Sequence, residues 1–294
     1  MVRLLNALCT AEGPQPSRLE GVNLLRVSRA TARTPALYEP CLAIVGQGRK
    51  RFFLPDRELV YDAERFLMLT VPVPADCATE VDDGPFLAVT VRIDLAVVSE
   101  LLVTLGERAS KMPPRRSPDE GLTTPRMLPS ISATAVRLLE CLRSADDARV
   151  LGPPLVRELL YRVLTSEHGG PLRDLLLGDE NRARIHRILE RLHLDYAAPL
   201  DLTSLARGAG MSHSALHAHF KAVTGTSPVQ YLKTLRLYKA RQLLVQSSLR
   251  AGAAAERVGY ASASQFSREF KRLFGASPVE EVQRVRATFG LTDP

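Results

Sequence analysis

The last hundred residues of the chain contain an internal repeat, which restricts the fold more than any other feature of the sequence. A Phe-Lys pair and a Gly-X-Ser-Pro-Val turn each occur twice with a spacing of 50 residues, at Phe220-Lys221 and Gly225–Val229 and again at Phe270-Lys271 and Gly275–Val279. Each copy follows a short apolar segment and a glycine, Gly210 or Gly259. A short helix, a glycine turn and a second helix form a helix-turn-helix. The sequence therefore predicts two such units, at about 201–225 and 250–275.

The second helix of each unit has an apolar and a polar face. Leu216 and Phe220 are four residues apart, as are Phe266 and Phe270, so each pair lies on one side of its helix and points into a core. A serine stands at each predicted N-cap. The helix between the units, at roughly 229–245, spans about 25 Å. We expect it to hold the two units about one duplex turn apart, a spacing of roughly 34 Å.

The repeat resembles the DNA-binding domain of the AraC/XylS family of transcription regulators over about residues 182–287. The residues that carry the resemblance are Leu205-Ala206, Gly210–Ser212, Phe220-Lys221, Gly225, Ser227-Pro228, Tyr231, Arg236-Leu237, Ala240–Leu244, Val258–Tyr260, Ser264–Lys271 and Gly275–Pro278. Two positions depart from the family pattern. Gly252 weakens the first helix of the second unit, which we expect to pack loosely, and Ala218 stands where many relatives have arginine.

The polar faces of the second helices supply the candidate DNA contacts. Base edges are read in the major groove, whereas phosphate contacts give affinity and register. For base contact we predict Ser214, His217, Ser264, Ser267 and Arg268. For phosphate contact we predict Ser212, Lys221, Arg236, Arg241, Ser262, Gln265, Lys271 and Arg272. Two alternatives stay open, namely an internal salt bridge for Arg268 and a solvated side chain for His217.

Charge is concentrated in the part of the chain that contains the repeat. Residues 182–294 hold 17 Lys and Arg against 8 Asp and Glu, whereas residues 1–181 hold 22 against 24. A basic module beside a near-neutral one indicates that only the basic module meets a polyanion. His213 and His217 are four residues apart, but no cysteine or acidic partner stands nearby, so we expect no zinc site.

The N-terminal part has the pattern of a small β-structure. Short apolar runs separated by turn residues predict about seven strands and a sandwich or barrel; they begin at Val22, Cys41, Arg51, Glu58, Arg65, Cys77 and Phe86. One of the turns is expected at Pro55-Asp56. The segments 36–40, 46–50 and 61–73 resemble the effector domain of one AraC/XylS branch, a cupin-like barrel. The resemblance implies a pocket for a small ligand, and a plain packed barrel is the alternative.

Metal and redox sites find no support in the sequence. Residues 1–167 contain no histidine, so we expect no cupin metal centre and no cofactor. The four cysteines show no short pairing, which favours buried thiols in a reducing compartment. No apolar run approaches the length of a membrane span, and we expect a cytoplasmic protein.

Four segments follow from these patterns. We expect an α+β chain with an N-terminal arm at 1–20 that includes a short helix at 2–9, a cupin-like β-barrel at 21–94, a helical region at 95–181 and an all-α DNA-binding domain at 182–294. Within the helical region, 111–118 reads as a loop, Ser130 as a helix cap and Pro153-Pro154 as the start of a second helix. The helices at 131–165 are expected to make a dimer, with core packing as the alternative.

The predicted function is sequence-specific transcription regulation, controlled by a small ligand in the barrel. The expected partners are double-stranded promoter DNA, a small effector whose binding residues stay unassigned, a second copy of the chain and, for an activator, RNA polymerase. A ligand-independent regulator whose barrel only dimerises is one alternative. An enzyme fused to a DNA-binding module is another, but no Ser-His-Asp or Cys-His set stands in the barrel, so we predict no catalytic residues.

Overall fold

The fold was examined in a computed structural model, which describes residues 1–54, 57–107, 121–177, 180–247 and 249–289. The turn expected at 55–56 and the loop expected at 111–118 lie outside these residues. The chain divides into two compact units. One comprises 1–33, 38–71 and 77–179, and the other comprises 34–37, 72–76 and 180–294. Within the described residues no helix is both long and apolar enough to cross a membrane.

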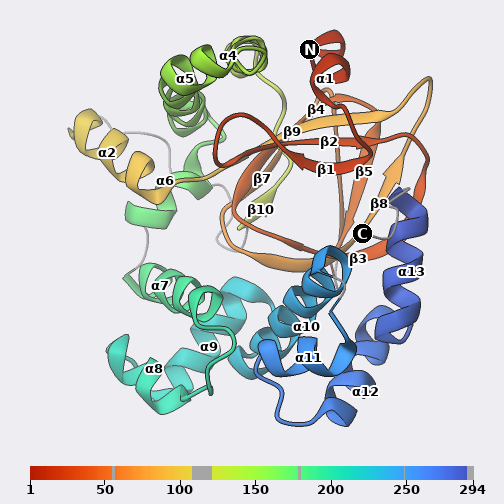
Figure 1. The fold of residues 1–294 in the computed structure, drawn as a ribbon. Helices are drawn as coiled ribbons and strands as arrows, with labels where there is room; N and C mark the ends of the chain where they lie inside the picture. Colours follow the sequence, from red (N-terminus) through yellow and green to blue (C-terminus); the bar gives the residue numbers. More distant parts are fainter. Residues whose placement is uncertain (55–56, 108–120, 178–179, 248, 290–294) are drawn as a thin grey trace. The chain divides into compact units, whose positions relative to one another are not determined.

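Two sheets form the N-terminal part of the fold (Figure 1). The six-stranded sheet has the order β1-β2-β9-β4-β7-β10, with β1 at Gly13–Pro16, β2 at Val22–Val27, β9 at Phe86–Arg92, β4 at Cys41–Gln47, β7 at Leu67–Leu69 and β10 at Leu122–Thr123. The four-stranded sheet has the order β3-β8-β5-β6, with β3 at Thr31–Tyr38, β8 at Val73–Glu80, β5 at Arg49–Phe53 and β6 at Glu58–Asp62. Neighbouring strands of the larger sheet pair antiparallel.

Alternate residues of the central strands face two different cores, because side chains along a strand point to opposite sides. Leu42 and Ile44 of β4 pack in a hydrophobic cluster with the helices of this unit. Ala43 and Val45, the residues in between, are equally buried but stand outside that cluster. The opposite face of the six-stranded sheet therefore contributes to a second, inner core.

Strands β1 and β3 were not predicted from the sequence, because both contain prolines. Pro14 and Pro16 lie in β1, and Pro35 lies in β3. Both strands stand at the edge of their sheets, where a residue without an N–H group costs no ladder hydrogen bond. Composition marks such segments as loops, and only the finished sheet shows that they pair.

The first twenty residues, expected as an arm with a short helix at 2–9, contain one helix and one strand. Helix α1, Val2–Leu8, buries Leu5 completely in the cluster of the N-terminal unit. Strand β1 then pairs with β2 in register from Gly13↔Arg26 to Pro16↔Asn23. The glycine and prolines of this segment suit an edge strand as well as a free arm, and the pairing of β1 with β2 distinguishes the two.

Helices complete the N-terminal unit, namely α2 at Leu95–Leu105, α4 at Pro129–Cys141, α5 at Ala145–Thr165 and α6 at Gly170–Leu177. Two details of the prediction were wrong. Helix α4 is capped by Leu128 with Pro129 in its first turn, not by Ser130. Helix α5 begins after the Ser144 cap and continues through Pro153 and Pro154. A proline inside a helix costs about 3 kcal/mol, and the buried Ala148, Leu155 and Leu159 offset that cost.

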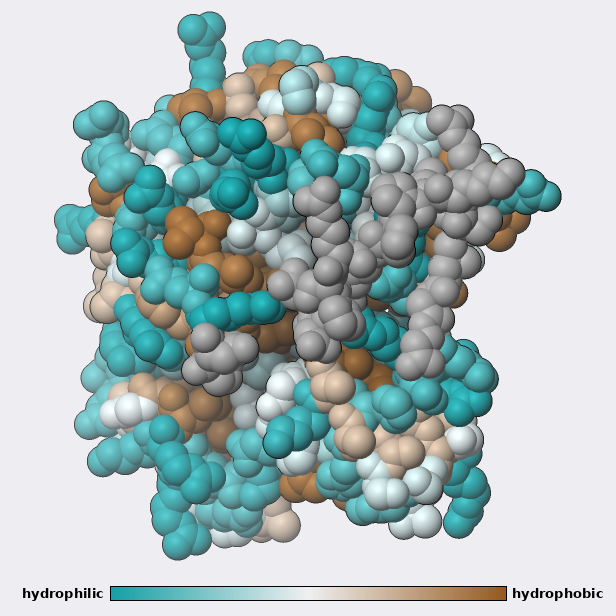
Figure 2. Space-filling view, turned by 180° about the vertical axis from the view of Figure 1, so that it is seen from behind, coloured by the Kyte–Doolittle hydropathy of each residue, from teal (hydrophilic) through white to brown (hydrophobic). Residues whose placement is uncertain are grey.

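The C-terminal unit is all helical. It comprises α7 at Glu180–Leu194, α8 at Leu202–Gly208, α9 at His213–Thr224, α10 at Pro228–Ser247, α11 at Ala251–Arg257, α12 at Ala263–Phe274 and α13 at Pro278–Phe289. The predicted α+β class is confirmed. Hydrophilic side chains cover most of the molecular face in Figure 2, and hydrophobic residues show there in separate patches.

Candidate nucleic-acid interface

The first helix-turn-helix unit consists of α8 and α9. The Asp201 carboxylate caps α8 by accepting hydrogen bonds from the Thr203 and Ser204 N–H groups at 3.0 Å. Gly210, with φ 63°, makes the turn. The Ser212 hydroxyl caps α9 by accepting from the Ala215 N–H at 3.2 Å. Gly225, with φ 75°, ends the helix in the left-handed conformation.

The second helix-turn-helix unit, α11 and α12, repeats the turn, the serine cap and the glycine end of the first unit. The Ser262 hydroxyl accepts from the Gln265 N–H at 3.3 Å, and Gly275 ends α12 with φ 74°. In both turns the residue after the glycine donates a backbone hydrogen bond to a carbonyl of the first helix. Met211 donates to the Ala206 carbonyl at 2.9 Å, and Tyr260 donates to the Ala255 carbonyl at 2.9 Å. The sequence repeat is therefore a repeat of backbone hydrogen bonding.

Helix α11 forms despite its weak sequence. Its N-cap, Arg250, makes no side-chain cap bond, and Gly252 lies in open space. Ala254, Ala255 and Val258 are nevertheless fully buried. The expectation that this helix packs loosely was wrong, because tertiary packing of its small residues outweighs its low helix propensity.

One helix, α10, is the spine of both helix-turn-helix units, because both pack against it. Tyr231, near the start of α10, meets Phe220 edge-on with ring centroids 5.5 Å apart. Tyr238, two turns later, meets Phe274 edge-on at 5.3 Å. Such edge-to-face contacts add to the burial energy of each pair. Helix α10 therefore fixes the position of α9 through its first half and of α12 through its second half.

The two second helices expose the residues expected to contact DNA. In α9 and its cap, Ser212, Ser214 and Lys221 are exposed, and His217 is half-buried. In α12 and its cap, the exposed residues are Ser262, Ser264, Gln265, Ser267, Arg268, Lys271 and Arg272. The apolar residues of the same helices, Leu216 and Phe220 and then Phe266 and Phe270, are fully buried. DNA contact by these side chains stays a prediction.

Arg236 has a different surrounding from the one that the sequence prediction assumed. Its guanidinium donates to the carbonyls of Tyr196 and Ala198 at 2.7 Å and of Gly259 at 3.1 Å. Burial lowers its pKa. These bonds tie the segment after α7 to the turn of the second unit, so the arginine holds the fold together instead of pointing at a phosphate.

Arg241 is also occupied inside the domain. Its Nε donates to the Glu281 carboxylate at 2.6 Å, and Glu281 is 0% exposed. The guanidinium lies 5.4 Å from the centre of the Phe274 ring. A cation with a buried carboxylate partner has little charge left for a phosphate, so we revise both arginines to structural residues.

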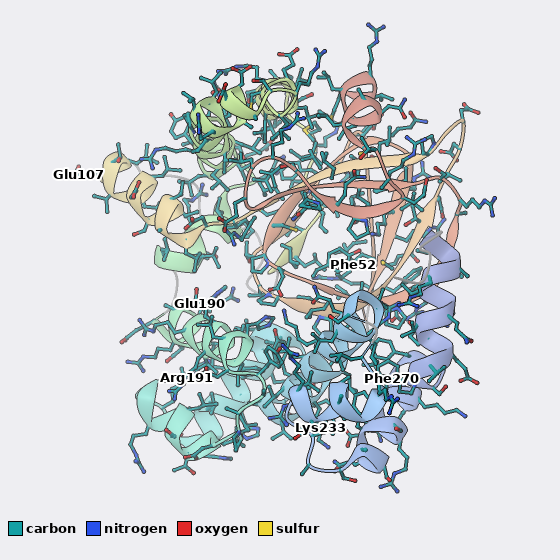
Figure 3. The ribbon with its side chains drawn as sticks, viewed as in Figure 1. Phe52, Glu107, Glu190, Arg191, Lys233 and Phe270 are labelled. Atoms are coloured by element: carbon teal, nitrogen blue, oxygen red, sulfur yellow. The ribbon has the colours of Figure 1, made fainter. Side chains whose placement is uncertain are left out.

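The sequence gave no sign of a polar network that positions α12. The Glu269 carboxylate accepts from Lys233 at 3.0 Å, Tyr260 at 2.8 Å and Gln265 at 3.1 Å. Burial raises the pKa of Glu269, but these three hydrogen bonds outweigh it and leave the pKa below its usual value. Lys233 lies on the spine α10, near the buried Phe270 of α12 (Figure 3). Gln265, predicted to contact phosphate, is thus partly engaged within the helix.

The two histidines of α9 lie together on its surface. The rings of His213 and His217 are 4.7 Å apart between centroids and tilted by 38°. In the described part of the chain, no group of three or more His, Cys, Asp or Glu side chains is arranged to hold a metal ion. The pair is available for hydrogen bonding to a ligand outside the helix.

Comparison with known families agrees with both halves of the fold. The family of the AraC-type transcriptional regulator N-terminus matches residues 18–171, and the helix-turn-helix domain family matches residues 205–284. The first match spans β2 to α5 and the second spans most of both helix-turn-helix units.

Individual relatives match mainly in part. The transcriptional activator RhaS of Escherichia fergusonii is 38% identical over 107 residues, 36% of this chain and 38% of RhaS. The activator RclR of Escherichia coli K12 is 37% identical over 131 residues, 45% of this chain and 44% of RclR. The chain thus matches less than half of either relative. The structure of ToxT from Vibrio cholerae superposes with a TM-score of 0.60 at 13% identity, covering 89% of this chain and 97% of ToxT.

Proposed function

The chain belongs to the family of AraC-type transcriptional regulators, and from this we propose that it is a sequence-specific DNA-binding regulator of transcription. The observation that supports the proposal most directly is the pair of capped helices, α9 and α12, whose apolar faces are buried and whose polar faces are exposed. A helix of this kind fits the major groove with its N-terminal residues at the base edges.

Both helices are proposed to contact bases and phosphates. Ser214 and His217 of α9 and Ser264, Ser267 and Arg268 of α12 are proposed to contact bases. Lys221, Lys271 and Arg272, with the helix N-termini at Ser212 and Ser262, are proposed to contact phosphates. Helix α10 has 20 residues and spans about 30 Å, close to one turn of duplex. One DNA segment then presents two successive major grooves to the protein.

The N-terminal unit is proposed to bind a small effector that controls DNA binding. ToxT, a protein of the same fold, has been solved with an unsaturated fatty acid bound. The inner core between the sheets supports a ligand site here, for reasons given below. A ligand-independent regulator is the alternative, and a DNA affinity that no small molecule changes favours it.

The remaining features of the proposal concern the oligomeric state, the domains and the cellular location of the protein. We propose a cytoplasmic regulator without catalytic activity, with segments at 1–20, 21–94, 95–181 and 182–294, a cupin-like barrel and RNA polymerase as a partner if it activates. We also propose a homodimer through α5, which exposes Val150, Leu151 and Tyr161. Exposed apolar side chains gathered on one helix are typical of an interaction surface.

DNA selection from a random pool, followed by titration of the selected duplex, tests the function. Arg268→Ala is expected to weaken binding to the selected duplex by about 1–3 kcal/mol and to relax the preference at one segment. Arg3→Ala, an equal loss of charge at an exposed position of α1, serves as the control and is expected to leave binding unchanged. Failure to select any sequence, or equal effects of both variants, contradicts the proposal.

A further inference from the structure

The N-terminal unit contains a buried lysine that the proposed function does not yet use. Lys50 lies on β5 and is 8% exposed. It pairs in register with Tyr61 of β6, and both side chains are buried. Phe52, two residues further along β5, is 0% exposed and points the same way by strand alternation. Figure 3 shows Phe52 among the strands of this unit. Lys50 therefore points into the inner core.

The surroundings of Lys50 come from both sheets. Its Nζ lies 5.4 Å from the centre of the Tyr38 ring on β3 and 5.9 Å from the Phe86 ring on β9. Ala43, Val45 and Ala88 are also buried outside the helix-side cluster. The ammonium group thus stands in an apolar, aromatic space between the two sheets.

No carboxylate of the described residues lies within ion-pair distance of Lys50. Its neighbours on the strand differ in this respect. Arg49 pairs with Asp62 and Glu80 at 3.7 Å each, and Arg51 pairs with Glu58 at 3.1 Å as well as with Glu80. Both arginines point away from the inner core, as strand alternation requires. The acidic residues of this region therefore form ion pairs with Arg49 and Arg51 on the outer face of β5, and not with Lys50 on its inner face.

The weakly acidic groups of the inner core stay neutral as well. Burial raises the pKa of the Tyr61 hydroxyl well above its usual value. Burial, with the neighbouring Tyr61 and Cys77 groups, does the same for Tyr38. Burial and the Glu39 charge raise the pKa of the Cys41 thiol to about 12, although Lys50 acts in the opposite direction. These groups supply no negative charge at neutral pH.

The Tyr38 hydroxyl of the inner core is also poorly hydrogen-bonded. It is buried beside the Tyr61 hydroxyl and the Cys77 thiol, whose hydrogen bonding contributes to its raised pKa, but neither of them forms a hydrogen bond of good geometry with it. A buried hydroxyl with only poorly aligned partners is unfavourable, as is a buried charge without a counter-charge. The cation–π contacts of Lys50 offset only part of that cost. Both groups are satisfied together if an anionic acceptor enters between them.

We propose that Lys50 and the Tyr38 hydroxyl bind the carboxylate of a small apolar monocarboxylic acid, whose body packs against Phe86 and the neighbouring aliphatic side chains. The proposal deepens the effector control proposed above and rests on it. A single cation matches a monoanion, and no second cation of the described residues is buried in this core to meet a phosphate dianion. The aromatic and aliphatic surroundings match an apolar body.

Thermal unfolding of the full chain tests this assignment. The probes are the sodium salts of the straight-chain acids from butanoate to decanoate and of phenylacetate, each compared with its primary amide at millimolar concentration. At least one carboxylate is expected to raise the Tm, and its amide is expected not to, because binding to the folded state alone stabilises it. Lys50→Met is expected to abolish the rise, and Arg49→Met, which removes the adjacent outer cation, is expected to retain it.

Two further measurements guard against a merely structural effect. Lys50→Met without ligand is expected to have a Tm equal to or above that of the natural chain, because it removes a buried unpaired charge. Tyr38→Phe, which removes only the hydroxyl, is expected to lower the affinity for the active carboxylate several-fold by calorimetry. A Tm unaffected by every carboxylate, or raised equally in Lys50→Met, overturns the proposal.

Failure of this site and failure of the proposed function are distinguishable. Lys50→Met is expected to bind the selected duplex as tightly as the unliganded natural chain. If DNA binding is intact but no carboxylate acts, the effector assignment is wrong and the DNA-binding role stands. If the selected duplex is not bound at all, the function itself is wrong.

Discussion

Single side chains of the C-terminal unit either maintain its fold or remain free for DNA, and Arg236 belongs to the first group. Its donors reach carbonyls on two sides, at Tyr196 and Ala198 and at Gly259. A lysine carries its donors on one nitrogen and cannot reach the carbonyls on both sides. Arg236→Lys is therefore expected to lower the free energy of unfolding by about 3 kcal/mol.

Urea unfolding followed by circular dichroism checks this expectation. Arg250→Lys, at an exposed position of the same unit, is the control and is expected to change the free energy of unfolding little. A loss of DNA affinity with unchanged stability in Arg236→Lys restores the phosphate contact that the sequence predicted.

The same substitution is expected to change stability in opposite directions at two glycines of the second helix-turn-helix. A Cβ at Gly252 meets nothing within 4 Å, so Gly252→Ala is expected to stabilise the unit by about 0.5–1 kcal/mol. Gly259 has φ 84°, and a Cβ there lies 2.2 Å from the Ala197 carbonyl oxygen. Gly259→Ala is expected to destabilise the unit by more than 1 kcal/mol. Midpoints of denaturant unfolding measure both, and equal signs contradict the structure.

His186 gives the C-terminal unit a dependence on pH. It lies buried on α7, and burial, followed by the charge of Arg182, lowers its pKa to about 4. The unfolded chain then binds more protons than the folded chain between about pH 6.5 and pH 4. Stability is expected to fall by about 2 kcal/mol from pH 7 to pH 5, from this residue alone.

Unfolding at the two pH values, in the natural chain and in His186→Gln, isolates the contribution. The variant is expected to lose less stability on acidification. Glu269 acts only at lower pH, since its pKa lies below the usual value of a glutamate and its stabilisation is lost as the pH falls through that range. A pH dependence unchanged in His186→Gln contradicts the assignment.

At the scale of elements, the two second helices are built alike but differ in charge. Helix α12 exposes Arg268, Lys271 and Arg272, whereas α9 exposes Lys221 beside its histidines. Phosphate contacts release counterions, so each lost contact changes the dependence of affinity on salt. Lys271→Ala is expected to weaken binding to all DNA sequences alike and to lower the salt slope by about one.

Titrations of selected and random duplexes at several salt concentrations measure this slope. Lys239→Ala, at a half-buried position on the spine α10, provides a charge-matched comparison and is expected to leave the slope unchanged. A loss restricted to the selected sequence, with the slope unchanged, shows that Lys271 reads a base.

At the scale of the whole molecule, the proposed dimer depends on α5. Val150 is 65% exposed and Tyr161 lies eleven residues further along the same helix, on the same side. Val150→Arg is expected to convert a dimer into a monomer and to weaken operator binding, because one subunit then binds without the other. Sedimentation checks the mass. Val103→Arg, at an exposed valine of α2, is expected to remain dimeric.

Local signals explain why so much of the C-terminal unit was predictable. The N-caps Ser212 and Ser262 and the left-handed glycines Gly225 and Gly275 act within a few residues of themselves. Their chemistry is therefore legible in the sequence, and the repeat doubles the signal. In the N-terminal unit, short apolar runs bounded by turn residues predicted β2, β4 and β9 for the same reason.

Positions whose role depends on distant residues were not predictable. Prolines in β1 and β3 read as breaks until the sheet order places both strands at edges. Helix α5 passes through Pro153 only because Leu155 and Leu159 are buried. The sequence around Leu5 does not show whether a hydrophobic core lies beside it.

The sequence by itself determined the two helix-turn-helix units, their boundaries and the polar residues that their second helices expose, because caps, glycine turns and helical periodicity are local properties. Only the tertiary structure decided that Arg236 and Arg241 hold the domain together and that Lys50 points into the inner core. In the sequence, a basic residue looks the same whether its side chain points into the core or away from it. Its role is set by the carbonyls, carboxylates and rings that distant parts of the chain place around it.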